Sequence, residues 1–77
     1  MKARGAVLTR REAHQAPVEN WGVLRAGDAV EIVRHAQVIA TGEVEEVSLS
    51  GNVLWIVPTG HERQLFLKSE GVLVRRA

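Results

Sequence analysis

The feature that most constrains the fold is the tract at 27–76, in which short runs rich in valine, isoleucine and leucine alternate with turn residues. Each run has the length of a strand, and three of the four stretches between the runs contain glycine, asparagine or serine, which favour tight turns. In the first run Val30 and Ile32 alternate with Glu31, as on a strand with one buried face. The pattern therefore predicts a very small all-β domain.

Five strands are expected in this tract, and a connection with the length of a single 3₁₀ turn, at 68–71, precedes the last of them. The expected strands lie at 29–34, 38–47, 53–57, 64–67 and 72–75. Five strands that are joined by tight turns, with a one-turn connection before the last, describe an SH3-like barrel. We expect this fold for residues 27–77, preceded by an N-terminal arm and anchor at 1–26.

The second expected strand changes phase near Glu45 and Glu46. One phase carries Val38, Ala40, Gly42 and Val44, whereas Val47 falls on the opposite phase. A slip of one residue is what a β-bulge produces, and bulges let a small sheet bend toward closure. We therefore expect a bulge at Glu45-Glu46.

The expected strand at 53–57 is apolar at every position. Alternation places three of its side chains on one face, and Leu54 and Ile56 on the other. A strand that is covered on both faces is central in its sheet, or has one face closed by a partner or by the N-terminal arm. The candidate interface residues are Trp21, Val53, Trp55 and Val57.

The core of this domain is expected to be small, because a chain of this size buries only about 60% of the surface that it exposes when unfolded. The chain has no cysteine, so neither a disulfide nor a thiolate-bound zinc stabilises it. Stability must come from packing, including packing against a second copy. The expected core residues are Val30, Ile32, Val44, Val47, Leu54, Trp55, Ile56, Leu65, Phe66, Val72 and Val74.

The N-terminal arm contains weaker signals. A short strand is expected at 3–9, and a short helix begins near Arg10 and is ended by Pro17. Trp21 is expected to anchor the arm to the domain, because a large aromatic side chain in so aromatic-poor a sequence usually belongs to the core.

The turn motifs along the tract also carry a resemblance to a known family. The motifs are Gly27-Asp28, Gly42-Glu43 with Glu46-Val47, Thr59-Gly60-His61-Glu62, and Gly71-Val72. In this order they resemble small SH3-like β-barrel proteins of unknown function from actinobacteria. The resemblance covers about residues 27–76 and does not include the first 26. It implies a fold, but neither an activity nor site residues.

Charge is distributed unevenly along the chain, although the net charge is only +1. Residues 1–27 carry +3, residues 28–62 carry −5 and residues 63–77 carry +3. One hypothesis is that the two basic ends lie together and bind nucleic acid, with Trp21 as a stacking surface. The candidate contacts are Arg10, Arg11, Arg25, Arg75 and Arg76. We prefer solvated faces or complementary contacts within or between subunits, because a nucleic-acid-binding domain is usually basic overall.

Motifs for catalysis, metal binding and cofactor binding are not found. The three histidines have no metal-binding spacing, no serine lies in a GxSxG motif, and the glycines form neither GxGxxG nor a phosphate-binding loop. We therefore expect no enzyme activity, no metal and no cofactor.

The expected function is that of a non-catalytic protein-interaction or self-association module, with nucleic-acid binding as the alternative. The apolar strand at 53–57 and the small core favour a homo-oligomer or a protein partner. No run approaches the roughly 20 apolar residues that span a bilayer, and no signal-peptide pattern is found. We expect a soluble, cytoplasmic protein without a membrane partner.

Overall fold

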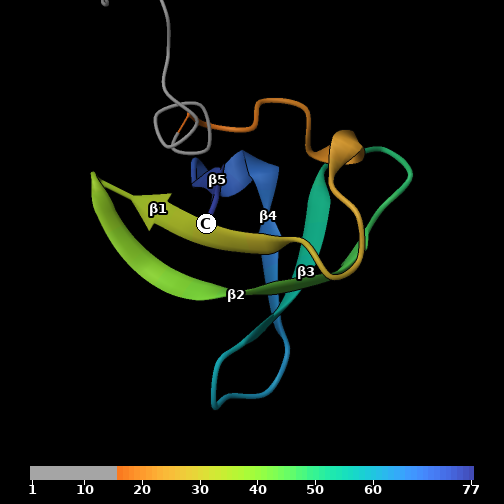
Figure 1. Cartoon of the computed structure of the whole chain (residues 1–77). Coiled ribbons are helices and arrows are strands. Elements are labelled where there is room, and N and C mark those ends of the chain that lie inside the picture. Colours follow the sequence, from red (N-terminus) through yellow and green to blue (C-terminus); the bar gives the residue numbers. More distant parts are fainter. Residues whose placement is uncertain (1–15) are drawn as a thin grey trace, which may run out of the picture.

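The computed structural model describes residues 16–77 as five antiparallel strands in one sheet (Figure 1). The strands are β1 (Ala29–Arg34), β2 (Gln37–Val47), β3 (Val53–Pro58), β4 (Gln64–Leu67) and β5 (Leu73–Arg76). Two short 3₁₀ helices are η2 (Trp21–Val23) and η3 (Lys68–Glu70). All five expected strands and the 3₁₀ turn before β5 are confirmed, with strand ends displaced by at most one residue. The strand at 3–9 and the helix expected from Arg10 fall largely or wholly outside the described residues.

The sheet has the strand order β4-β3-β2-β1-β5. Strands β1 to β4 follow one another as a meander, and β5 returns to pair with β1 on its other side. Figure 1 shows the long, curved β2 passing from its pairing with β1 to its pairing with β3. Within residues 16–77 no pairing joins β4 to β5, so the sheet is open. The all-β prediction is confirmed, and closure into a barrel is not shown.

The bulge expected at Glu45-Glu46 is confirmed. Val44 pairs with Ile56, and Glu46 pairs with Trp55. Glu45 has no partner between them, so the register shifts by one residue there. Because of this shift, Val44 is buried and Val47 also packs against the core, although the two lie on opposite phases of a regular strand.

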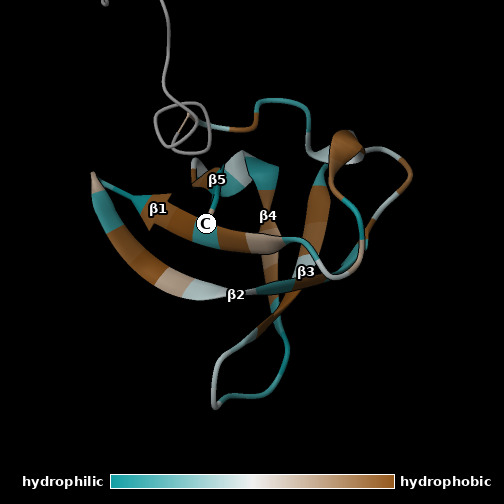
Figure 2. Ribbon diagram, viewed as in Figure 1, coloured by the Kyte–Doolittle hydropathy of each residue, from teal (hydrophilic) through white to brown (hydrophobic). Residues whose placement is uncertain are grey.

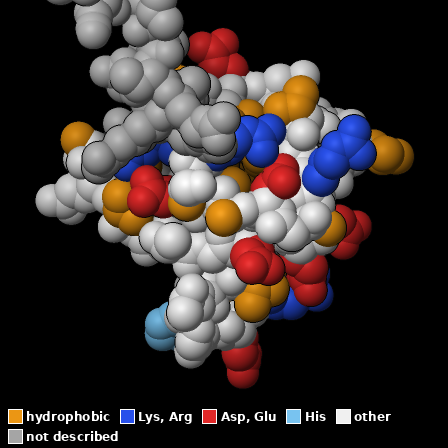
Figure 3. All heavy atoms as spheres, in the orientation of Figure 1, with side chains coloured by type: hydrophobic (Ala, Val, Ile, Leu, Met, Phe, Trp, Pro, Cys, Tyr) orange, Lys and Arg blue, Asp and Glu red, His pale blue; other side chains and the backbone are white. Residues whose placement is uncertain are grey.

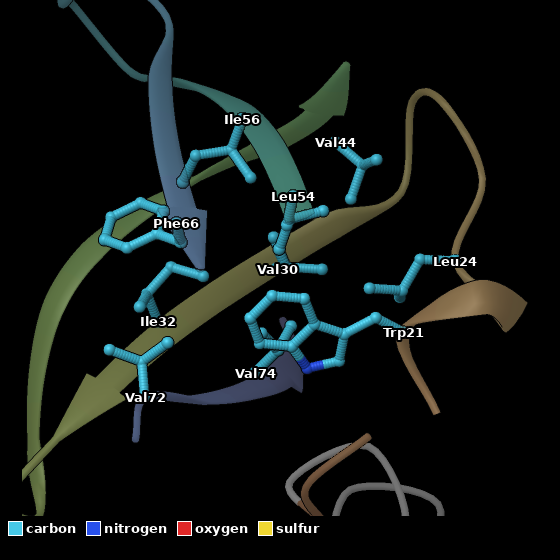
Figure 4. Close-up of a cluster of buried hydrophobic side chains, with 10 residues drawn as sticks. All are labelled: Trp21, Leu24, Val30, Ile32, Val44, Leu54, Ile56, Phe66, Val72 and Val74. Atoms are coloured by element: carbon cyan, nitrogen blue, oxygen red, sulfur yellow. The ribbon is translucent and has the colours of Figure 1, made fainter. Parts of the chain in front are cut away.

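The core lies on the concave side of the bent sheet (Figure 4). Its buried side chains come from η2, the following turn and all five strands or their ends. They are Trp21, Leu24, Val30, Ile32, Val44, Leu54, Ile56, Phe66, Val72 and Val74. The core prediction is confirmed at all of these strand positions, and Val47 is only partly buried against the cluster.

Two expected core residues, Trp55 and Leu65, lie on the opposite face of the sheet. They pair across β3 and β4, whereas the adjacent pair of Leu54 and Phe66 points into the core. Leu65 is 43% exposed, and Trp55 is half-buried. The prediction was wrong because residues 53–57 are all apolar, so the sequence does not reveal which face of β3 points inward. Figure 2 shows much of β3 in brown, the hydrophobic colour.

Trp21 anchors the segment before β1, as expected. Its side chain is 1% exposed, and the side-chain oxygen of Asn20 accepts the N–H of Gly22 at 2.9 Å at the start of η2. Upstream, Val18 donates its N–H to the carbonyl of Val74 at 2.7 Å. The anchor is therefore held by both packing and backbone hydrogen bonds.

The hairpin between β1 and β2 turns through two non-glycine residues with positive φ, His35 at 52° and Ala36 at 64°. A non-glycine residue in this left-handed region is destabilised by about 1–2 kcal/mol, and two-residue turns of this kind favour Asn-Gly.

We expect Ala36→Gly to raise the free energy of unfolding by about 1 kcal/mol, because glycine adopts positive φ without this cost. Urea denaturation measures the change. Ala26→Gly is the matched control, because Ala26 lies in a turn without positive φ and should lose stability. A loss in Ala36→Gly would contradict this prediction.

Candidate protein-binding face

The face of the sheet opposite the core carries a second apolar surface on β3 and β4. It consists of Val53, Trp55, Val57, Leu65 and Leu67, and we call it the β3–β4 face. Val53 pairs with Leu67 and Trp55 with Leu65, so these side chains lie side by side. Val57, Leu65 and Leu67 are 42%, 43% and 38% exposed. Three of the four candidate interface residues therefore lie together on an accessible face.

Leu65 and Leu67 were missed as candidates by sequence reasoning. A usable signal was present, because they share one phase of β4 while Phe66 occupies the other. The short connection between β3 and β4 also indicates a hairpin, in which leucines of one phase pair with Val53 and Trp55. The pairing of Leu65 with Trp55 on the outer face was missed because both Leu65 and Phe66 were expected in the core.

Trp55 is held in place by a basic side chain. The guanidinium carbon of Arg63 lies 4.2 Å from the centroid of the Trp55 ring, and Arg63 Nε lies 2.7 Å from Glu45 Oε1. Both charged side chains are exposed to solvent by about half, so the ion pair itself contributes little stability. Its effect is to hold Arg63 over the indole, where a cation–π contact fixes one side of the ring.

Carboxylates border the β3–β4 face. Glu46 lies opposite Trp55 and Glu43 lies opposite Val57 in the β2–β3 register. Glu43 and Val57 also line an open groove together with Glu62 from the β3–β4 connection. In Figure 3, acidic side chains are grouped with apolar ones on the lower part of the visible surface. The face thus has an apolar centre and an acidic border.

Strand β4 is one edge of the sheet among the described residues. Lys68 donates its N–H to the carbonyl of Asn52 at 2.8 Å, so the alternating pattern directs the backbone groups of Leu65 and Leu67 away from β3. The N–H of Leu67 is taken by Glu70 Oε1 at 3.2 Å. The backbone of Leu65 is therefore the main hydrogen-bonding site left at this edge.

The arginines of β5 do not form one basic surface. Arg75 Nη2 donates to Glu31 Oε1 at 3.0 Å, and Arg76 Nη1 donates to Asp28 Oδ2 at 3.1 Å. Because they are adjacent on a strand, their side chains point to opposite sides of the sheet. Both are partly buried and engaged in contacts within the domain.

Arg25 lies near Arg76 through a shared partner. The exposed Arg25 donates its backbone N–H to Asp28 Oδ2 at 2.9 Å. This hydrogen bond and, to a lesser degree, the Arg76 guanidinium lower the pKa of Asp28 below its ordinary value, against an opposing effect of desolvation. Of the three basic candidates within residues 16–77, Arg25 and Arg76 thus share Asp28 as a partner, whereas Arg75 pairs with Glu31. Arg10 and Arg11 lie outside the described residues.

Trp21 is not available as an interface residue or as a stacking surface for bases. Its ring is buried in the core, and the ammonium of Lys68 lies 5.7 Å from the ring centroid. The same ammonium donates to the carbonyl oxygen of Glu19. Its assignment as a contact residue is therefore corrected: Trp21 supports the fold from inside.

Residues 16–77 contain no group of three or more His, Cys, Asp or Glu side chains that is arranged to hold a metal ion. No helix formed by these residues is long and apolar enough to cross a membrane. Comparison with protein-family models, curated proteins and solved structures finds no match to this chain.

Proposed function

We propose that this protein is a non-catalytic interaction module that associates with a second copy of itself through the β3–β4 face. The observation that carries the proposal is the set of five exposed or half-exposed apolar side chains on two adjacent strands. Burial of apolar surface contributes roughly 25 cal/mol per Å², and contiguous exposed apolar patches mark interaction sites. Self-association would also enlarge the small hydrophobic interior of each copy.

We also propose that the domain is an SH3-like barrel in the cytoplasm. Three features support the fold: the meander of β1 to β4, the single 3₁₀ turn η3 between β4 and β5, and the pairing of β5 with β1. The absence of cysteine from the chain fits a reducing compartment.

Nucleic-acid binding, the alternative function, has less support. Arg75 and Arg76 are engaged with carboxylates, and Trp21 is buried. Titration of labelled single-stranded and duplex oligonucleotides across a salt series tests this alternative, because phosphate contacts make affinity strongly salt-dependent. Absence of binding at low salt would remove it.

The proposal predicts that Leu65→Glu dissociates the self-associated protein. A carboxylate at this position would be buried against apolar side chains of the second copy, close to the carboxylates that already border the face. We expect the dissociation constant of the dimer to rise by at least about tenfold. Sedimentation velocity over a range of micromolar concentrations measures this change.

Leu73→Glu is the matched control for this experiment. Leu73 lies on β5, the other terminal strand in the sheet order, and is 50% exposed. The same chemical change there should leave the dissociation constant nearly unaltered. A wild-type protein that remains monomeric at every concentration, or equal dissociation by both variants, would contradict the proposed binding face.

A further inference from the structure

The carboxylates that border the β3–β4 face lack ion-pair partners in the part of the chain that the structure describes. Glu45 is paired with Arg63, whereas Glu43, Glu46 and Glu62 are in none of the ion pairs formed by these residues. Three such carboxylates beside an apolar surface create a negative potential there. A partner that covers this face must bring basic groups as well as apolar ones.

All Lys and Arg side chains of residues 16–77 except that of Arg25 are already engaged. Lys68 donates to a backbone carbonyl, and the exposed Arg25 donates its backbone N–H to Asp28. The others are paired with carboxylates of the same domain, namely Arg34, Arg63, Arg75 and Arg76. Two β3–β4 faces that packed directly against each other would place unpaired carboxylates near one another. Direct face-to-face packing is therefore electrostatically unfavourable.

The first fifteen residues of the chain have the missing chemistry. They carry a net charge of +3, whereas residues 16–77 carry −2. The apolar run Ala6-Val7-Leu8 lies between Arg4 on one side and Arg10-Arg11 on the other. An apolar run between basic groups complements a face with an apolar centre and an acidic border.

We propose that residues 2–11 of a second copy bind the β3–β4 face, so that two copies exchange their N-terminal segments. This inference rests on the proposed function, because it names the occupant of the same face. The second copy is favoured because Val18 and Trp21 pack against the core, on the side of the sheet opposite to the β3–β4 face. The described part of the segment thus enters its own domain on the core side. Reciprocal exchange gives a closed two-fold pair in which both faces are covered.

The first test removes basic groups from the full-length chain. Arg10→Ser/Arg11→Ser should raise the dissociation constant of the dimer by at least about tenfold, because it removes charge that faces the acidic border. Arg25→Ser/Arg34→Ser removes the same charge from the described domain and should change the constant by less than about threefold. Sedimentation equilibrium at low and high salt measures both variants, and the wild-type dimer should weaken as salt rises.

The second test exchanges the charges. Arg10→Glu/Arg11→Glu and Glu43→Arg/Glu46→Arg should each weaken the dimer, and their combination in one chain should restore the dissociation constant to within about threefold of wild type. Both glutamates are exposed, so the fold should tolerate the change, and circular dichroism checks this. Restoration requires that the two sets of side chains meet, which general destabilisation does not produce.

The outcomes separate this inference from the proposed function. If Leu65→Glu dissociates the dimer while Arg10→Ser/Arg11→Ser behaves like its control, the proposed function stands and the exchange of segments is overturned. If the wild-type protein is monomeric throughout, both are overturned. If the arginine variant shifts the NMR signal of the Trp55 indole N–H in a strictly monomeric sample, the segment binds its own domain and exchange between copies is overturned.

Discussion

Trp21→Ala is expected to lower the free energy of unfolding by about 3–5 kcal/mol, which is most of the stability of a domain of this size. The indole is 1% exposed and packs in the same cluster as Leu24, Val30 and Val74 (Figure 4). Its removal would lose apolar burial and leave a cavity that so small a core cannot fill. Urea denaturation followed by far-UV circular dichroism measures the loss.

Trp55→Ala is the matched control, because it makes the same chemical change on the other face of the sheet. Trp55 is half-buried and contacts Arg63, so we expect a loss of only about 1 kcal/mol. Equal losses at the two positions would contradict the assignment of Trp21 to the core and Trp55 to the β3–β4 face. The comparison therefore tests which tryptophan is inside.

Gly42→Ala is expected to cost about 3 kcal/mol or more. Gly42 on β2 pairs with Pro58 on β3, and a Cβ at position 42 would collide with the carbonyl oxygen of Val57 and lie 2.7 Å from Pro58 Cα. These are backbone atoms, so relief requires the two strands to separate. Thermal unfolding measures the effect as a lower midpoint.

Thr41→Ala serves as the control for Gly42→Ala. Thr41 is the preceding residue of β2, is exposed and pairs with Glu31, so alanine should change the free energy of unfolding by about 0.5 kcal/mol or less. If Gly42→Ala proved as mild as Thr41→Ala, the close approach of β2 and β3 at this position would be wrong.

Strands were well predicted from the sequence because their signals are local. Alternation and turn residues decide where β1 and β4 begin and end, and the phase slip at Glu45 reveals the bulge without any knowledge of the partner strand. The inward face of β3 was not predictable in this way. Both phases of β3 are apolar, and only the structure shows that Leu54 and Ile56 share the core with Trp21 while Trp55 lies on the other face.

The candidate site was predicted only in part for a related reason. The alternation within a single strand was enough to predict that Val53, Trp55 and Val57 share a face. The ion pair of Arg75 with Glu31 could not be predicted in this way, because it joins residues 44 positions apart in the chain. Charge along the sequence shows that basic and acidic segments exist, but not which side chains neutralise one another. Only the register of the sheet shows which carboxylates pair with Arg75 and Arg76, and that Glu43 and Glu46 lie beside the β3–β4 face.

The contacts at the two ends of the strand order have a consequence for how large an assembly can become. Pro17, which has no N–H, lies against Arg75 beside β5, and Glu70 occupies the N–H of Leu67 on β4. An open sheet would otherwise serve as a template on which further chains add strand by strand. Because the β5 edge is obstructed and the backbone of Leu65 is the main site left on β4, filament growth is disfavoured, and assemblies of this chain should be finite.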